Sequence, residues 1–510
     1  MLNLDTALKF TDFHQVIFKN EKLELGSFSQ KKLQESFDFL QEFANNKIIY
    51  GVNTGFGPMA QYKIDEQDKI KLQLNLIRSH STGAGALMEP IYVKALMLAR
   101  LNTLCLGKSG IHTSVVDCLI NLINHEVTPV IFEHGGVGAS GDLVQLAHLA
   151  LVLIGEGEVI YKGERRLTKT VFEELDIKPA EIKIREGLAV MNGTSAMTGI
   201  GIVNLIYAKR LLGWAVFCSA VINEIVEAYD DHLSEELNSS KLHPGQQKIA
   251  KRMRKHLADS RLTRDRNDHL YANGADKNSF FQEKVQEYYS LRCVPQILGP
   301  VSDTIENSLK ILMEEVNSAN DNPIIDVETK HVYHGGNFHG DYISLEMDKL
   351  RLVMTKTSML AERQLNYLLN SKLNDILPPF VNLGKLGLNF GMQGAQFTAV
   401  STTAENQMLS NSMYVHSIPN NNDNQDIVSM GANSANMTKK VIDNCFEVIS
   451  TELATIVQAL YYLDFDNRLS LATKKKLGKL RSIIPPVKED RPLYNEIGKL
   501  KDFLRNNEAY

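Results

Sequence analysis

Apolar residues recur at helical spacing along much of the second half of the chain. Between residues 342 and 369 the gaps between successive apolar positions are 4, 3, 4, 7, 4 and 3, which is the spacing of a buried seam in a helix bundle or coiled coil. The seam consists of Ile343, Met347, Leu350, Met354, Ala361, Leu365 and Leu368. The pattern predicts one long helix whose apolar side packs against other helices.

Two further segments carry the same kind of pattern, whereas the first half of the chain does not. They run through Val441, Cys445, Val448, Ile456 and Leu460, between residues 437 and 463, and through Val301, Ile305, Leu312 and Val316. In the first half, short apolar runs alternate with glycine-rich turns such as residues 48–57. We therefore predict a mainly α fold: a central bundle of long helices with a smaller mixed N-terminal portion. We expect an N-terminal domain of residues 1–200 and a bundle with C-terminal helices of residues 201–510, fused into one unit.

The composition excludes several classes of partner. The 510 residues include 55 Lys and Arg against 60 Asp and Glu, and this net charge of −5 is not the basic surface that nucleic acid requires. The most apolar runs are residues 149–154 and the two runs beside Lys209-Arg210, and each is shorter than the roughly 20 residues that cross a bilayer. We therefore expect neither a nucleic-acid partner nor a membrane partner.

The spacing of cysteines and histidines indicates a reducing compartment and predicts no metal site. The five cysteines are widely spaced and include no Cys-x-x-Cys, so neither a disulfide framework nor a zinc site is expected. The 14 histidines include no His-x-x-x-His pair, so we expect no metal site. The first residues lack the basic segment and apolar run of a signal peptide. We predict a cytoplasmic protein.

A glycine-rich motif at residues 136–141 has two interpretations. Its sequence, Gly-Val-Gly-Ala-Ser-Gly, matches the Gly-x-Gly-x-x-Gly fingerprint of dinucleotide-binding folds, and Glu156 follows at the expected distance. The surrounding sequence argues against a dinucleotide site, because it lacks alternating βαβ units and the motif does not open a domain.

The second interpretation is chemical. Ala139, Ser140 and Gly141 are small enough for the amide nitrogen of Gly141 to attack the carbonyl carbon of Ala139 in a compressed turn. Loss of one water closes a five-membered ring, and loss of the Ser140 hydroxyl as a second water leaves an exocyclic methylene. Asp142 can cap the following helix, whose N-terminus stabilises negative charge nearby. The motif thus predicts an electrophile made from the chain itself.

Seven ordered motifs are spread along nearly the whole chain. They are residues 50–57 (Tyr-Gly-Val-Asn-Thr-Gly-Phe-Gly), 138–143 (Gly-Ala-Ser-Gly-Asp-Leu), 192–194 (Asn-Gly-Thr), 289–293 (Tyr-Ser-Leu-Arg-Cys), 320–323 (Asn-Asp-Asn-Pro), 336–339 (Gly-Asn-Phe-His) and 424–426 (Asn-Gln-Asp). Together they resemble the histidine, phenylalanine and tyrosine ammonia-lyases, which carry a methylidene-imidazolone (MIO) group. The resemblance implies elimination of ammonia from an aromatic L-amino acid by an MIO group formed from Ala139-Ser140-Gly141, with no external cofactor. It also implies a homotetramer whose chains share active sites.

The resemblance further implies roles for single residues. Tyr50 would remove the β-proton of the substrate, and because a free tyrosine has a pKa near ~10 its surroundings must activate it. Arg292 would hold the substrate carboxylate by two-point pairing, while Asn192 and Tyr289 would hydrogen-bond the carboxylate and the MIO region. The other implied substrate-binding residues are Gly57, Ser79, His80, Gln286, Phe338, Glu405 and Gln425. Taken singly, each residue has an ordinary structural explanation, and only their order within the motifs favours the functional one.

Two motifs disagree about the substrate. Ser79-His80 resembles the ring-binding pair of the histidine enzymes, whereas Gln425 within Asn-Gln-Asp resembles the tyrosine and phenylalanine branch. His80 can hydrogen-bond a phenol, and a neutral amide at position 425 suits an imidazole less well than a carboxylate would. We therefore predict conversion of L-tyrosine to trans-p-coumarate, with phenylalanine as a weaker side activity. The alternatives are a histidine ammonia-lyase that makes urocanate, an MIO aminomutase, and a non-enzymatic relative with a helical assembly role.

Overall fold

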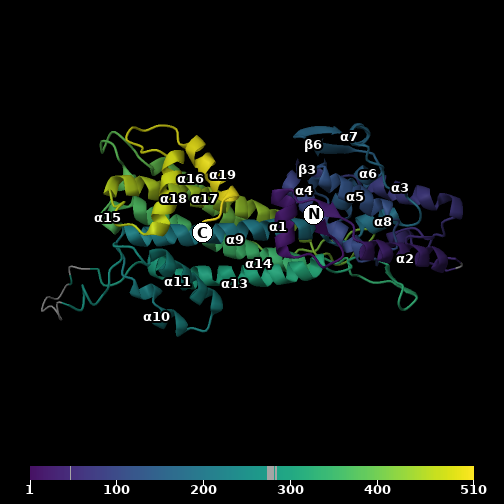
Figure 1. The fold of residues 1–510 in the computed structure, drawn as a ribbon, viewed down its shortest axis with the longest axis horizontal. Helices are drawn as coiled ribbons and strands as arrows, with labels where there is room; N and C mark the ends of the chain where they lie inside the picture. The colour runs from purple at the N-terminus through teal and green to yellow at the C-terminus, as the bar shows by residue number, and fades with distance from the viewer. Residues whose placement is uncertain (46, 273–280, 282–283) are drawn as a thin grey trace. The chain divides into compact units, whose positions relative to one another are not determined.

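The computed structural model describes residues 1–45, 47–272, 281 and 284–510. Within these residues it contains 19 α-helices and nine short strands (Figure 1). The structure is 58% helical, which confirms the predicted mainly α fold.

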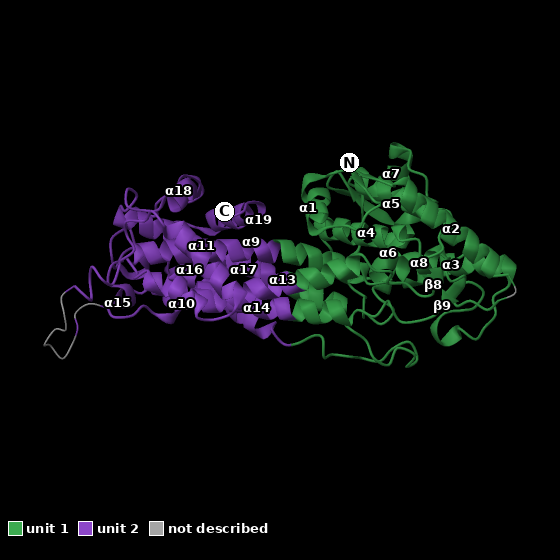
Figure 2. Ribbon diagram, turned by 60° about the horizontal axis from the view of Figure 1, so that its bottom comes forward, with its two compact units in different colours: residues 1–206, 308–348, 412–439 green, residues 207–307, 349–411, 440–510 purple. Residues whose placement is uncertain are grey.

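The chain divides into two compact units, each assembled from segments that are far apart in sequence (Figure 2). Unit 1 consists of residues 1–206, 308–348 and 412–439, and unit 2 of residues 207–307, 349–411 and 440–510. Four long helices contribute residues to both units. These helices are α9 (Ser195–Ile225), α13 (Val294–Val316), α14 (Asp341–Leu369) and α17 (Gly431–Leu463).

Unit 1 combines helices with all of the strands that the described residues form. Its own helices are α1 (Phe10–Lys19), α2 (Ser27–Phe43), α3 (Lys69–His80), α4 (Pro90–Cys105), α5 (Ser114–Asn124), α6 (Leu143–Leu153), α7 (Thr168–Leu175) and α8 (Glu186–Met191). Its strands are β1 (Leu2–Asn3), β2 (Leu23–Glu24), β3 (Ala84–Leu87), β4 (Thr128–Pro129), β5 (Phe132–His134), β6 (Glu158–Tyr161), β7 (Glu164–Leu167), β8 (Ile324–Asp326) and β9 (His331–Tyr333). The mixed character predicted for the N-terminal portion is therefore present in this unit.

The strand that precedes the glycine-rich motif does not belong to a parallel βαβ unit. β5 pairs antiparallel with β3, and β6 pairs antiparallel with both β4 and β7. A dinucleotide fingerprint needs a parallel strand running into the helix that follows the glycines. The geometry around residues 136–141 therefore agrees with the rejection of a nucleotide site.

Unit 2 is built from helices that pack along one another. Besides its parts of the four long helices it contains α10 (Glu235–Ser239), α11 (Pro244–Leu257), α12 (Tyr289–Arg292), α15 (Ser371–Asn374), α16 (Gln393–Met408), α18 (Leu471–Ile483) and α19 (Tyr494–Asn506). Within the unit, the thiol of Cys445 on α17 donates to the carbonyl oxygen of Met354 on α14 at 3.2 Å. The Nε2 of Gln364 on α14 donates to Ser219 Oγ on α9 at 2.9 Å, so these three helices are neighbours.

The predicted apolar seams are buried. Every seam residue of α14 is at most 2% exposed, as expected for a helix held by its apolar stripe. α13 begins earlier than the pattern predicted, at Val294, and contains Pro300 inside it. α17 also begins earlier, at Gly431, because its first turns are rich in small and polar residues that carry no apolar period.

The two apolar runs beside Lys209-Arg210 form one continuous helix, so treating them as two short runs was wrong. α9 has 31 residues and is long and apolar enough to cross a membrane by length and composition alone. However, 94% of its most apolar window is buried inside the protein, which is the setting of a core helix. Arg210 is accommodated because its Nε lies 3.1 Å from the carboxylate of Glu508.

Candidate active site

A cavity of about 410 Å³ in unit 1 brings together many of the residues predicted to act on the substrate. It is lined by Tyr50, Phe56, Gly57, Pro58, Met59, Leu72, Asn75, Leu76, Ser79, His80, Ser140, Leu143, Leu188, Asn192, Asn421, Asn422 and Gln425. The volume is that of a small-molecule site, and the lining mixes apolar walls with a few polar groups.

The loop that carries Tyr50 is closed by backbone hydrogen bonds at its base. The N–H of Ile64 donates to the carbonyl of Asn53 at 3.1 Å, and the N–H of Gly55 donates to that of Tyr62 at 3.0 Å. The tip is a single 3-10 turn at Gly57–Met59, where Gly57 adopts a left-handed φ of +52°. Its N–H donates to Tyr50 Oη at 3.1 Å, and a fixed backbone donor at this oxygen stabilises negative charge on it.

The Ala139-Ser140-Gly141 segment is held tightly against a second loop. Gly141 has a φ of +73°, and a Cβ at this position would lie only 2.1 Å from the carbonyl oxygen of Gly193. Asn192 Nδ2 donates to the Ser140 carbonyl oxygen at 3.0 Å, and Gln425 Nε2 donates to Ser140 Oγ at 2.8 Å. Amides from two distant segments therefore hold the central residue.

Asp142 follows this segment and is fully buried. One carboxylate oxygen accepts the N–H of Met197 at 2.8 Å, and the other has no hydrogen-bond partner. Burial raises the pKa of Asp142 to about 7, although hydrogen bonds from the backbone of Met197 and Ala196 oppose this rise. Asp142 occupies the predicted N-cap position of α6, but its side chain makes no capping hydrogen bond.

A buried arginine fixes the loop that contains Asn192. The Arg100 guanidinium donates to the carbonyl oxygen of Asn192 at 2.9 Å and to Asn320 Oδ1 at 3.0 Å. Because Arg100 is fully buried, these directed bonds orient the loop strongly. Asn192 Oδ1 has no hydrogen-bond partner, although it is buried beside the cavity.

One side of α3 forms a wall of the cavity. Leu72, Asn75, Leu76 and Ser79 lie on one helical face by their spacing, and His80 ends the helix. Asn75 and Leu72 were not among the predicted site residues, although counting back four and seven positions from Ser79 finds them. His80 Nδ1 lies 3.0 Å from the carbonyl oxygen of Leu76 and 3.0 Å from Ser79 Oγ.

Seven predicted residues do not line this cavity: Ala139 and Gly141 flank Ser140 in the chain, and the other five lie elsewhere. Gln286, Tyr289 and Arg292 belong to unit 2 and line another cavity of about 550 Å³. There Arg292 contacts Gln286 Oε1, and its guanidinium lies 4.8 Å from the centre of the Tyr289 ring. Phe338, in unit 1, and Glu405, in unit 2, line neither cavity. Glu405 accepts a hydrogen bond of 2.6 Å from Asn444 Nδ2.

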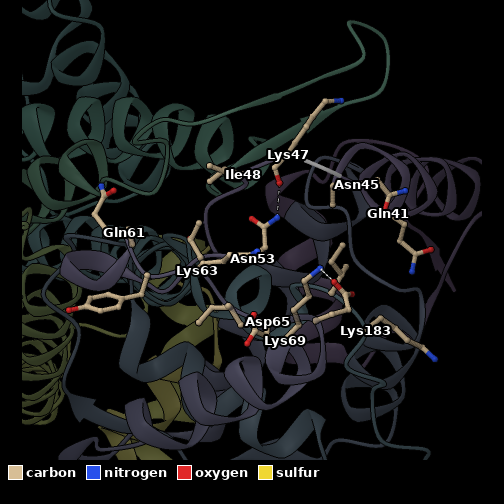
Figure 3. Close-up of a pocket in the computed structure, with 17 residues that line it drawn as sticks. Gln41, Asn45, Lys47, Ile48, Asn53, Gln61, Lys63, Asp65, Lys69 and Lys183 are labelled. Carbon is tan, nitrogen blue, oxygen red and sulfur yellow. Dashed lines mark hydrogen bonds and ion pairs between the residues drawn. The ribbon is translucent and has the colours of Figure 1, made fainter.

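A larger cavity of unit 1, about 780 Å³, contains none of the predicted site residues (Figure 3). Its lysines do not converge on its centre. Lys47 extends away from the other labelled side chains, over the ring of Phe43 at 3.5 Å (Figure 3). Lys69 pairs with Glu66 at 2.5 Å. The 410 Å³ cavity is therefore the candidate active site.

The chain belongs to the aromatic amino acid lyase family, whose sequence profile matches residues 8–482. This finding confirms the resemblance inferred from the seven motifs.

Individual relatives match almost the whole chain. A tyrosine 2,3-aminomutase from Chondromyces crocatus is 38% identical over 98% of this chain and 94% of its own length. A histidine ammonia-lyase from Caldanaerobacter subterraneus subsp. tengcongensis is 36% identical over 98% of this chain and 95% of its own length. The crystal structure of a tyrosine aminomutase from Streptomyces globisporus superposes with a TM-score of 0.94 at 34% identity, covering 99% of this chain and 96% of that one.

Proposed function

We propose that the protein is a tyrosine ammonia-lyase that converts L-tyrosine to trans-p-coumarate and ammonium. The observation that carries this proposal is the meeting of Tyr50, Ser140 and His80 in one cavity of about 410 Å³. They supply a general base, an electrophile precursor and a partner for a ring substituent.

The residues around Ser140 fit an MIO group. Gly141 is left-handed and lies where no side chain could fit, so this position requires the glycine from which the group would form. Asn192 would hold the group through the Ser140 carbonyl oxygen, which the ring keeps, and Gln425 lies beside the Ser140 side chain that would become the methylene. The unpartnered Asn192 Oδ1 is free to accept a hydrogen bond from a ligand in the cavity. When formed, the group supplies an electrophilic carbon for the amine of the substrate, which makes a poor leaving group a better one.

Tyr50 is the proposed base. Its oxygen accepts the Gly57 N–H and faces the cavity, so it can take the β-proton of a bound amino acid. The electron pair of the broken C–H bond forms the Cα–Cβ double bond as the C–N bond breaks. Ammonium and the unsaturated acid then leave.

The ring end of the cavity favours a phenol. A carbonyl can only accept hydrogen bonds, so His80 Nδ1 carries the proton directed at the Leu76 carbonyl, and Nε2 of the neutral ring is an acceptor. A tyrosine hydroxyl satisfies this acceptor, whereas phenylalanine would leave it unpaired. The residues that line the cavity include no carboxylate, which an imidazole substrate would prefer.

Assembly into a homotetramer is part of the proposal. The cavity lining contains no Lys or Arg to pair with the substrate carboxylate, and Arg292 belongs to unit 2. We infer that the Gln286–Arg292 segment of a second copy completes the site, and the 69% exposure of Tyr289 is consistent with this role. Apolar side chains on α14 and α16 support association, because Tyr342 and Phe397 are 72% and 66% exposed.

The cytoplasm is the proposed location. All five cysteines are free thiols and four of them are buried, as expected for a reducing compartment.

A tyrosine aminomutase is the second candidate. It is favoured by the likeness to proteins named tyrosine aminomutases over almost the entire chain. Such an enzyme would return the amine to the β-carbon instead of releasing it.

The decisive experiment measures products from L-tyrosine, L-histidine and L-phenylalanine in separate incubations. We expect p-coumarate from tyrosine to form fastest, followed by near-ultraviolet absorbance, with the amino acids analysed by chromatography. Faster formation of urocanate from histidine would overturn the choice of substrate. Accumulation of β-tyrosine would favour the second candidate.

A substitution at position 425 tests the choice of substrate independently. Gln425→Glu adds a carboxylate to a cavity that lacks one, so the ratio of kcat/KM for histidine to that for tyrosine should rise. Gln407→Glu, an exposed position on α16, is the matched control and should leave the ratio unchanged. Equal ratios in both variants would remove the argument from Gln425.

Intact mass tests the electrophile without an activity assay. The chain should be lighter than its sequence by two water molecules, and Ser140→Ala should not reach that mass. Ser318→Ala, an exposed serine, should keep it. A wild-type chain of full mass would contradict the MIO proposal.

A further inference from the structure

Residues 420–425 form a turn with an unusual backbone. Asn420 and Gln425 exchange two backbone hydrogen bonds of 3.2 and 3.3 Å. Between them Asn421, Asn422 and Asp423 adopt φ angles of 55°, 53° and 59°, three left-handed residues in succession. Residues other than glycine visit this region mostly one at a time, and Asn and Asp tolerate it best. The sequence Asn-Asn-Asn-Asp-Asn is therefore suited to a left-handed turn.

One end of this turn lies against the loop that carries Tyr50. A Cβ built on Gly57 would lie 2.6 Å from Asn421 Nδ2 and 3.3 Å from its Cγ, so the Asn421 amide covers the α-carbon of Gly57. The N–H of Gly57 donates to Tyr50 Oη at 3.1 Å. Asn421 thus contacts the residue that holds the oxygen of the proposed base.

The other end of the turn lies against the proposed electrophile. Gln425 Nε2 donates to Ser140 Oγ at 2.8 Å. Asn421 and Gln425 both line the 410 Å³ cavity. One short turn therefore contacts both Ser140 and the loop of Tyr50, two residues that lie about ninety positions apart in the sequence.

We propose that the Asn421–Asp423 turn sets the separation between Tyr50 Oη and the Ser140 centre, and that Asn421 is a positioning residue acting through Gly57. The inference rests on the proposed function, because it assumes that Tyr50 is the base. The tip of the Tyr50 loop is hydrogen-bonded within itself, through Met59 N–H to Phe56 and Ala60 N–H to Gly57. These bonds do not tie the tip to the rest of the protein, so the contact from Asn421 is needed to hold the tip in one position.

Asn421→Gly removes the amide while keeping a residue that adopts a positive φ at no steric cost. We expect kcat to fall by about tenfold to a hundredfold, as displacement of a reacting group does, with a smaller change in KM. The acidic limb of the kcat/KM profile, which reports ionisation of the base, should move to higher pH because Gly57 holds the Tyr50 oxygen less firmly. The intact mass should remain two waters below the sequence mass.

Asn421→Asp distinguishes positioning from a merely structural role. Aspartate keeps the shape and the left-handed backbone but sets a negative charge beside Gly57. The acidic limb should move further than in Asn421→Gly, by about one pH unit, because a like charge disfavours the ionised base. A structural role would give no dependence on charge.

Asn20→Gly is the matched control. Asn20 is a left-handed asparagine with a φ of 55° that ends α1, in unit 1 but outside the cavity. It should leave kcat and the pH profile unchanged. Wild-type kcat and pH limbs in both Asn421 variants would overturn the inference. Absence of elimination by the wild-type enzyme would instead contradict the proposed function, before any variant is compared.

Discussion

A buried ion pair of unit 1 and a buried carboxyl group of unit 2 differ in how their charge is accommodated. In unit 1 the buried Arg185 and Asp321 form a two-point ion pair, with both N–O distances 3.0 Å, and Arg185 also donates to the carbonyl oxygen of Asn322 at 3.0 Å. Beside this pair Arg100 binds Asn320 and Asn192. Charged groups thus connect the 320–322 segment to the loop that lines the cavity.

In unit 2 a buried carboxyl group has no such partners. Glu452 on α17 is fully buried, neither of its oxygens has a hydrogen-bond partner, and it lies beside the Cys218 thiol. Burial raises its pKa well above the ordinary value for a glutamate. The Arg185–Asp321 pair of unit 1 keeps its charges and satisfies them with directed bonds, whereas Glu452 of unit 2 is buried in its neutral form. Directed bonds of the first kind also fix the loop of Asn192, which lines the candidate site.

The largest expected effect separates activity from stability in unit 1. Tyr50→Phe removes the proposed base and one hydrogen-bond acceptor, so kcat should fall by about 10²- to 10⁴-fold while the unfolding transition stays in place. Tyr462→Phe, at a 50% exposed tyrosine of α17, is the control and should retain full activity. Steady-state kinetics and thermal unfolding of both variants test this. Retention of activity in Tyr50→Phe would remove Tyr50 from the mechanism.

The second prediction concerns the contribution of the buried ion pair to the free energy of unfolding. Asp321→Ala leaves Arg185 buried and without its carboxylate, so the free energy of unfolding should fall by about 3–5 kcal/mol. Glu156→Ala removes the partner of Arg78 in an ion pair whose side chains are 49% and 41% exposed, and should cost at most about 1 kcal/mol. Urea unfolding curves of the two variants give both values. Equal losses would show that burial does not distinguish the two pairs.

The long helices and the residues of the motifs could be predicted from the sequence. Which of those residues share one cavity could be predicted less well. The α14 seam could be predicted because its apolar residues recur with the period of an α-helix. Tyr50, Ser140 and Gln425 were accessible through their motifs. The role of Asn421 was not, because its contact with Gly57 joins loops hundreds of residues apart and has no local periodicity. Phe338 and Glu405 show the same limit, because a position in a motif does not specify which cavity the side chain reaches.

The smallest effect tests the neutral carboxyl group of unit 2 through its pH dependence. Glu452 has a raised pKa in the folded protein, so the unfolded chain loses this proton at lower pH than the folded one. Stability is therefore lost as pH rises above about 4.5, by ~1.4 kcal/mol for each unit by which the pKa is raised.

Glu452→Gln is uncharged at every pH and similar in shape. Its free energy of unfolding should exceed that of the wild type by a margin that grows between pH 5 and pH 8. Glu447→Gln, on the same helix but partly exposed beside Lys501, should differ from the wild type by less than about 0.5 kcal/mol across this range. A Glu452→Gln variant that is equally destabilised at all pH values would mean that the carboxyl group is satisfied, and the contrast between the two units would fail at that residue.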